Sequence, residues 1–138
     1  MQGIRRCALV LGFLLFGGTA LHAQSAPAGK STNEGVYTAE QAARGEKVSV
    51  EVCSMCHSPK EDFTRNGFLN SWTGKPIRAL FHNLKETMPE DMPGSLSAQQ
   101  YADVVAYILK LNGMPTGSSE LKSDDESLST IIFERKKQ

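Results

Sequence analysis

Apolar and polar positions follow a helical period most clearly near the C-terminal end of the chain. Apolar side chains recur there at spacings of three and four residues. They are Tyr101, Val104, Val105, Ile108 and Leu109. Ser97 and Gln100 fit a capping box in front of this run, and Gly113 follows it where helices often end. We therefore expect an amphipathic helix between Ser97 and Gly113.

Two further segments favour helices. The first runs from Ala39 to about Cys53, after a capping-box pattern at residues 38–41, and is interrupted by Gly45. In the second, Pro76 suits the first helical turn, and the helix should stop before Pro89. Its apolar positions at helical spacing are Ile77, Leu80, Phe81 and Leu84.

The remaining stretches show no sustained helical period of apolar residues. Residues 58–73 contain Pro, Gly and polar side chains and are interpreted as a loop, and residues 118–138 as a charged C-terminal tail. Residues 26–35, rich in Ala, Pro, Gly and Ser, are expected to be a flexible mature N-terminus. The prediction is one all-α domain over residues 36–117 with three main helices. Such a domain has a thin core, which suggests that something else fills its middle.

The first 25 residues differ from the rest. Arg5 and Arg6 precede an apolar run over residues 8–16, and small residues follow it. This is the three-part pattern of a secretory signal peptide, and the run is shorter than the roughly 20 residues of a membrane span. We expect a cleaved leader, a periplasmic protein and no stable membrane span after cleavage. The alternative is an uncleaved leader that anchors the protein in the membrane.

Charge excludes one class of partner. The chain has 15 basic and 15 acidic side chains, and removal of the leader leaves acidic residues in a slight excess. Because nucleic-acid binding needs a clustered basic face, we expect no nucleic-acid partner. Of the three cysteines, Cys7 lies in the leader, so the mature protein keeps only Cys53 and Cys56.

These two cysteines form the motif with the clearest chemistry. Residues 53–57 read C-S-M-C-H, the C-x-x-C-H attachment pattern of c-type haem. At the end of a helix, two cysteines three apart can each form a thioether with one haem vinyl group. The adjacent His57 then becomes the proximal iron ligand. The expected cofactor is therefore one covalent haem c.

Other uses of a C-x-x-C pair fit less well. A thiol–disulfide redox pair needs the motif at a helix N-terminus, where the helix dipole lowers the thiol pKa, whereas here it follows its helix. A structural zinc site requires four protein ligands. After the leader, the candidates would be Cys53, Cys56, His57 and His82, and the sequence has no second C-x-x-C.

A sixth iron ligand has several candidates, because His/Met ligation is a known arrangement that raises the reduction potential. The candidates are Met55, Met88, Met92 and Met114, with His82 as an outsider. Met88 and Met92 lie in the loop that must cross the second haem face. Met88 leaves a longer stretch before the last helix than Met92, so chain reach favours Met88.

These residues resemble class I mono-haem cytochromes c, in particular the small cytochromes associated with pyrroloquinoline-quinone (PQQ) alcohol dehydrogenases. The matching segments are "GVYTAEQAARGEKV", "CSMCH", "FLNSWTGKPIRALFHNLKETMP" and "PGSLSAQQYADVVAYILKLNGMPTG". The resemblance implies that Met88 is the axial ligand and that Gly45 packs against Tyr107. The family commonly has a Gly after the histidine and a Pro-x-Leu-x-Gly segment, which this chain lacks. In the family a Pro carbonyl of that region accepts the hydrogen bond of the proximal histidine, so the resemblance does not identify the partner of His57 in this chain.

The sequence thus predicts an electron-transfer protein rather than an enzyme. Trp72 is a candidate hydrogen-bond donor to a haem propionate, or an apolar wall residue. The expected partners are redox proteins, with a PQQ-dependent dehydrogenase as donor and a terminal oxidase as acceptor. A further hypothesis, which differs only in the partner, makes the protein a subunit of a dehydrogenase complex. An alternative from another class is a haem enzyme or gas sensor with an open sixth position.

Overall fold

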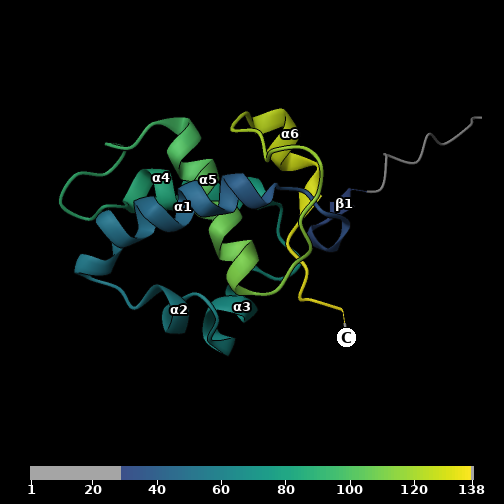
Figure 1. Cartoon of the computed structure of the whole chain (residues 1–138), viewed down its shortest axis with the longest axis horizontal. Coiled ribbons are helices and arrows are strands. Elements are labelled where there is room, and N and C mark those ends of the chain that lie inside the picture. Colours follow the sequence, from purple (N-terminus) through teal and green to yellow (C-terminus); the bar gives the residue numbers. More distant parts are fainter. Residues whose placement is uncertain (1–28, 138) are drawn as a thin grey trace, which may run out of the picture.

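The computed structural model describes residues 29–137, so the expected leader over residues 1–25 lies outside the described residues (Figure 1). The elements in chain order are β1 (Lys30–Ser31), η1 (Thr32–Glu34), α1 (Ala39–Glu51), η2 (Cys53–Met55), α2 (Pro59–Asp62), α3 (Asn66–Trp72), α4 (Ile77–Thr87), α5 (Ala98–Leu111), α6 (Asp125–Ser129) and β2 (Ile131–Ile132). The three longest helices, α1, α4 and α5, are the three that the sequence predicts.

Helices α1 and α5 cross at a glycine. A Cβ added to Gly45 would lie 1.8 Å from the carbonyl oxygen of Asp103 and 3.0 Å from the Cβ of Tyr107. The two helix backbones can approach this closely only because Gly45 has no side chain. Figure 1 shows α1 passing in front of α5 at the centre of the molecule. The expectation that Gly45 packs against Tyr107 is confirmed.

Helix α5 is the centre of the core. Residues 101–109 are all buried, so α5 is covered on nearly every side rather than along one stripe. The capping box of Ser97 and Gln100 is present, and Gly113, with φ of +73°, follows the helix as expected. Helix α4 buries Ile77, Leu80 and Phe81.

The prediction that residues 58–73 form a loop is wrong. The segment forms α2 and α3, of four and seven residues. Pro59 stands in the first turn of α2, and the Asp62 carboxylate accepts a hydrogen bond from the Ser58 N–H over 2.9 Å. Helices this short present too few turns for an apolar period to be visible in the sequence.

The two ends of the described chain are also more ordered than predicted. Strands β1 and β2 pair in parallel, and Ser31 and Thr32 are buried, so an unstructured segment over residues 26–35 is wrong for its described part. The tail after residue 117 contributes buried core side chains, at Leu121, Leu128, Ile131 and Phe133. Its last described residues, 135–137, are exposed, as expected for a solvated end.

One capping prediction is half right. The Thr38 side chain accepts a hydrogen bond from the Gln41 N–H, as a cap should. The Gln41 side chain does not reach back, however. Its amide is fully buried and bonds the N–H and carbonyl of Leu121 over 2.7 and 2.8 Å. The buried N–H and carbonyl of Leu121 need hydrogen-bond partners, and the Gln41 side chain provides them instead of capping the helix.

None of the helices between residues 29 and 137 combines the length and apolar character that a membrane crossing requires.

Candidate functional site

The cysteine motif lies on a tight turn directly after α1. The N–H groups of Cys56 and His57 both donate to the carbonyl of Cys53, over 3.1 and 2.9 Å. Helix α1 ends at Glu51 and η2 continues the winding through Met55. This turn gathers the two thiols and the imidazole within one short stretch, and both thiols are free.

The surroundings of Cys53 do not favour a reactive thiolate. Burial raises the pKa of the Cys53 thiol, and the neighbouring Ser49 hydroxyl only partly opposes this. Redox-active C-x-x-C pairs rely on a lowered thiol pKa instead. The structure therefore gives no support to a thioredoxin-like reaction at this motif.

His57 is half-buried and has a carboxylate beside it. Its Nδ1 lies 3.6 Å from Oδ2 of Asp62, and its side chain is 35 % exposed. The rings of His57 and Phe63 have centroids 5.8 Å apart. Sequence analysis did not single out Asp62, because this residue lies on the short helix α2, in a segment that was interpreted as a loop.

Met88 is tethered through both of its backbone groups. It follows α4 directly, and its N–H donates to the Leu84 carbonyl over 2.9 Å. Its carbonyl accepts a hydrogen bond of 2.7 Å from the Tyr101 hydroxyl on α5. The Met88 side chain is partly buried. Sequence reasoning assigned Tyr101 only to the apolar core and missed this role of its hydroxyl.

The other methionines have different surroundings. Met55, between the cysteines, is 76 % exposed, and Met92 is 61 % exposed. Met114 is buried, and its carbonyl accepts a hydrogen bond from the Tyr37 hydroxyl over 2.7 Å. His82, the outsider, lies at the surface between α4 and α6, with its two ring nitrogens facing Glu86 and Asp125.

Partly exposed apolar side chains pack against the core from several elements. They are Val52, Phe68, Leu69, Trp72, Leu84, Leu96 and Leu111. They belong to the end of α1, to α3, to α4, to α5 and to the loop before α5. Large apolar side chains left partly open on so many elements suit a bulky apolar group.

Trp72 is partly buried at the end of α3. Its ring lies beside that of Phe68, with centroids 6.3 Å apart, and the Lys75 Nζ lies 5.3 Å from the Trp72 ring centroid. Among the described residues, no hydrogen bond takes up the Trp72 indole N–H. An indole donor next to a lysine cation suits a carboxylate, and the propionate role of Trp72 stays a prediction.

The donor set fits a covalent haem better than a bare metal ion. Within residues 29–137, no three His, Cys, Asp or Glu side chains come together as a metal site would require. Haem c uses two thiols for attachment, and an imidazole and a thioether can serve as its axial ligands. The chain offers such groups at Cys53, Cys56, His57 and Met88, and the backbone of Met88 is tethered.

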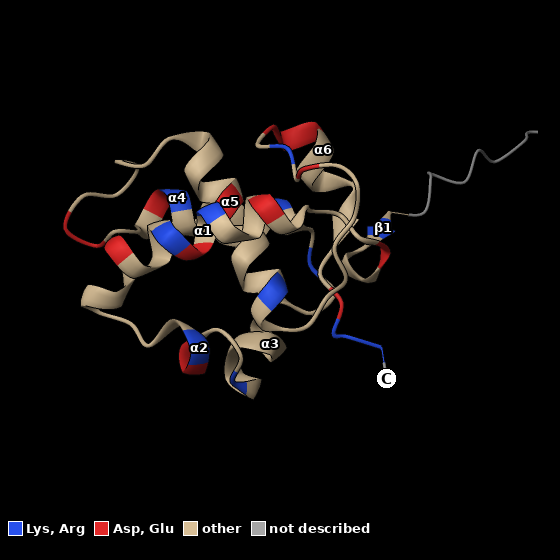
Figure 2. Cartoon of the chain, viewed as in Figure 1, with Lys and Arg blue, Asp and Glu red and all other residues tan. Residues whose placement is uncertain are grey.

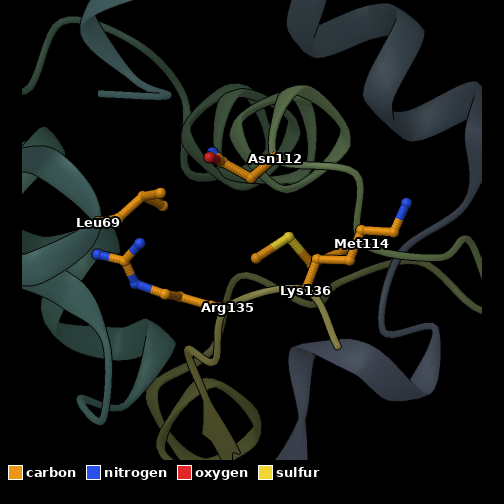
Figure 3. A pocket seen from close by; sticks show the side chains of 5 residues that line it. All are labelled: Leu69, Asn112, Met114, Arg135 and Lys136. Carbon is orange, nitrogen blue, oxygen red and sulfur yellow. The ribbon is translucent and has the colours of Figure 1, made fainter. Parts of the chain in front are cut away.

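A hollow of about 250 Å³ lies on another part of the surface (Figure 3). It is lined by Leu69, Asn112, Met114, Arg135 and Lys136. The Arg135 guanidinium donates to the side-chain oxygens of Asn66 and Asn70 over 3.1 and 2.6 Å. The last described residues are basic, whereas the loop between α4 and α5 carries Glu90 and Asp91 (Figure 2). Because Arg135 is already bonded to α3, we assign this hollow to the docking of the tail.

Comparison with known families agrees with this chemistry. A family model described as "Cytochrome C oxidase, cbb3-type, subunit III" matches residues 40–108, which is half of the chain. The chain belongs to this cytochrome c family. Neither a curated protein nor a solved structure matches the chain significantly.

Membership of this family confirms three predictions. The fold is the small all-α cytochrome c fold, the cofactor is covalent haem c, and the protein is a haem-based electron carrier. The matched range contains the C-S-M-C-H motif, Met88 and most of α5.

Proposed function

We propose that this cytochrome is an exported carrier of single electrons, with haem attached at Cys53 and Cys56 and with His57 and Met88 as axial ligands. The haem supplies an iron that alternates between two oxidation states. The observation that carries the assignment of Met88 is the pair of backbone hydrogen bonds to Leu84 and Tyr101. They hold Met88 between α4 and α5, whereas Met92 is 61 % exposed.

In this proposal the chain holds and shields the cofactor. Leu80, Val104 and Val105 are buried and exclude water, which limits the reorganisation that accompanies electron transfer. No side chain has to move a proton, and no substrate reaches the iron. Trp72 and Lys75 are the proposed contacts for a propionate, through a hydrogen bond and a charge.

We further propose a periplasmic location, which rests on the leader pattern over residues 1–25. There the protein would accept electrons from a PQQ-dependent dehydrogenase, as an independent carrier or a subunit, and deliver them to a terminal oxidase. Cell fractionation tests the location and distinguishes a cleaved leader from an anchor. Affinity purification of the tagged holoprotein from native membranes tests the dehydrogenase, whose absence from the eluate would contradict this partner.

The ligand assignment is tested by the visible spectrum of the oxidised holoprotein. A bond from methionine sulfur to ferric iron produces a weak charge-transfer band at long wavelength. We expect this band in the wild type and in Met92→Ala, and its loss in Met88→Ala. Loss only in Met92→Ala would transfer the ligand to Met92 and keep the function.

The same samples test the alternative from another class. A wild-type protein that lacks the band and binds carbon monoxide readily when reduced would have an open sixth position. That result would overturn the proposed closed His57/Met88 site and would favour an enzyme or a gas sensor.

A further inference from the structure

The surroundings of His57 contain one acidic side chain that is held in place by the backbone. Asp62 ends α2, one turn after His57, and its Oδ2 accepts the Ser58 N–H over 2.9 Å. The same oxygen lies 3.6 Å from Nδ1 of His57. The other carboxylate oxygen faces the Arg65 guanidinium at 3.6 Å. The Ser58 N–H thus orients the carboxylate, with one oxygen turned to the imidazole.

We propose that Asp62 is the hydrogen-bond acceptor for Nδ1 of His57 and that its negative charge lowers the reduction potential of this cytochrome. The proposal rests on His57 being an axial ligand, as argued above. A histidine that binds metal through one ring nitrogen usually donates the N–H of the other to a carboxylate, a carbonyl or a water. The 3.6 Å separation exceeds a hydrogen bond, so a small ring rotation or one bridging water must close it.

A carboxylate that accepts the His57 hydrogen bond affects the reduction potential differently from a neutral acceptor. An anionic partner pulls the Nδ1 proton toward itself and makes the imidazole a stronger electron donor to a metal. A stronger donor stabilises the oxidised iron, which lowers the reduction potential. Phe63 packs against the same ring, with centroids 5.8 Å apart, and is itself only 8 % exposed, so one side of the pair is shielded from water. Asp62 therefore acts as a positioning and tuning residue.

A purely structural role for Asp62 is the competing explanation. The Ser58 N–H bond alone would make this residue a local cap of α2. The Asp62→Asn variant separates the two roles, because asparagine keeps an oxygen acceptor for Ser58 and removes only the charge. Glu61→Gln is the matched control, since Glu61 is the neighbouring carboxylate on α2 and is exposed. Both variants lose one negative charge at almost the same place.

The reduction potential of the holoprotein is the first readout. We expect Asp62→Asn to favour the reduced form by about tenfold, which raises the potential by about 59 mV for one electron. Glu61→Gln should shift the potential much less, because its charge is exposed and screened. Equal shifts in both variants would show that Asp62 acts only as one more surface charge and would overturn the proposal.

Proton NMR of the reduced protein is the second readout. A strong hydrogen bond to a carboxylate moves the His57 Nδ1 proton downfield, so Asp62→Asn should move it upfield, and Glu61→Gln should leave it in place. An unchanged proton in Asp62→Asn would contradict the proposal. The ring-current shifts of the other His57 protons report axial ligation separately. Their absence in the wild type would refute the ligand assignment itself rather than the role of Asp62.

A second pair of variants covers the case in which Asp62→Asn does not yield holoprotein. Arg65→Gln removes the cation that faces Asp62. Lys60→Gln is its control, because Lys60 is a nearby cation of α2 that forms no ion pair with Asp62. Arg65→Gln should lower the potential and move the His57 Nδ1 proton downfield, because the carboxylate is then free to bind the imidazole. The same response in both variants would overturn the proposal.

Discussion

The hydroxyl of Tyr101 donates a hydrogen bond of 2.7 Å to the backbone carbonyl of Met88. This bond joins α5 to the start of the loop that carries the proposed sulfur ligand. Met88 can thus be held in place by the backbone before any metal bond forms, which reduces the loss of conformational entropy when the ligand binds.

Replacing Tyr101 by phenylalanine removes only this hydroxyl. We expect the free energy of unfolding to fall by about 1 kcal/mol, the usual worth of a hydrogen bond. We also expect added imidazole to displace Met88 at lower concentration, followed by loss of the sulfur–iron band. Tyr37→Phe is the control, because it loses a bond of the same 2.7 Å length to the Met114 carbonyl. If both variants respond equally to imidazole, Tyr101 does not hold the ligand.

Gly45→Ala should disrupt the crossing of α1 and α5. The added Cβ would lie 1.8 Å from a backbone oxygen of Asp103, which cannot rotate away. We expect a loss of at least about 3 kcal/mol on chemical denaturation, at the upper end of overpacking effects. Gly67→Ala is the control, since a Cβ at Gly67 meets nothing within 4 Å. That variant should be neutral or gain up to about 1 kcal/mol from helix propensity.

Phe133→Ala tests whether the C-terminal tail is part of the core. Phe133 is 1 % exposed, and its N–H and carbonyl bond the backbone of Lys75 and Gly74. We expect the variant to lose about 3–5 kcal/mol of stability, as large-to-small changes in cores do. Lys136→Ala, three residues later and exposed, should change stability by less than about 0.5 kcal/mol. Equal stability of the two variants would mean that the tail is dispensable.

The acid side of the stability curve should depend on Asp125. The hydrogen bond from His82 holds the pKa of the Asp125 carboxyl below its ordinary value. A depressed carboxyl pKa adds stability above the unfolded value of about 3.9, and this stability is lost as the pH falls through the folded pKa. Denaturation of Asp125→Asn between about pH 2 and 5 should therefore show a flatter decline than the wild type. Glu126→Gln, one residue on, should keep the wild-type slope.

Much of the helical framework was predictable because its causes are local. The Ser97 capping box and the apolar spacing of α5 lie within one continuous segment. The same is true of α1 and α4, whose predicted ends differ little from those observed. The short helices α2 and α3 were missed, since four and seven residues give no visible period.

The candidate site divides in the same way. Cys53, Cys56 and His57 are recognisable from their spacing alone, because the turn after α1 acts over neighbouring residues. Asp62 was missed although it is only five residues from His57, since its role depends on the direction in which α2 turns its side chain. The pairing of Gln41 with Leu121 joins residues 80 apart and has no local signal.

The sequence by itself determined the haem-attachment motif, the three long helices and the need for something to complete a thin core. These follow from covalent spacing and from helical periodicity, which act over a few residues. Only the tertiary structure decided that the tail buries Leu128 and Phe133, that Tyr101 holds the Met88 carbonyl and that Asp62 faces His57. Such contacts depend on how separate elements pack, and packing brings together side chains whose partners the chain order does not reveal.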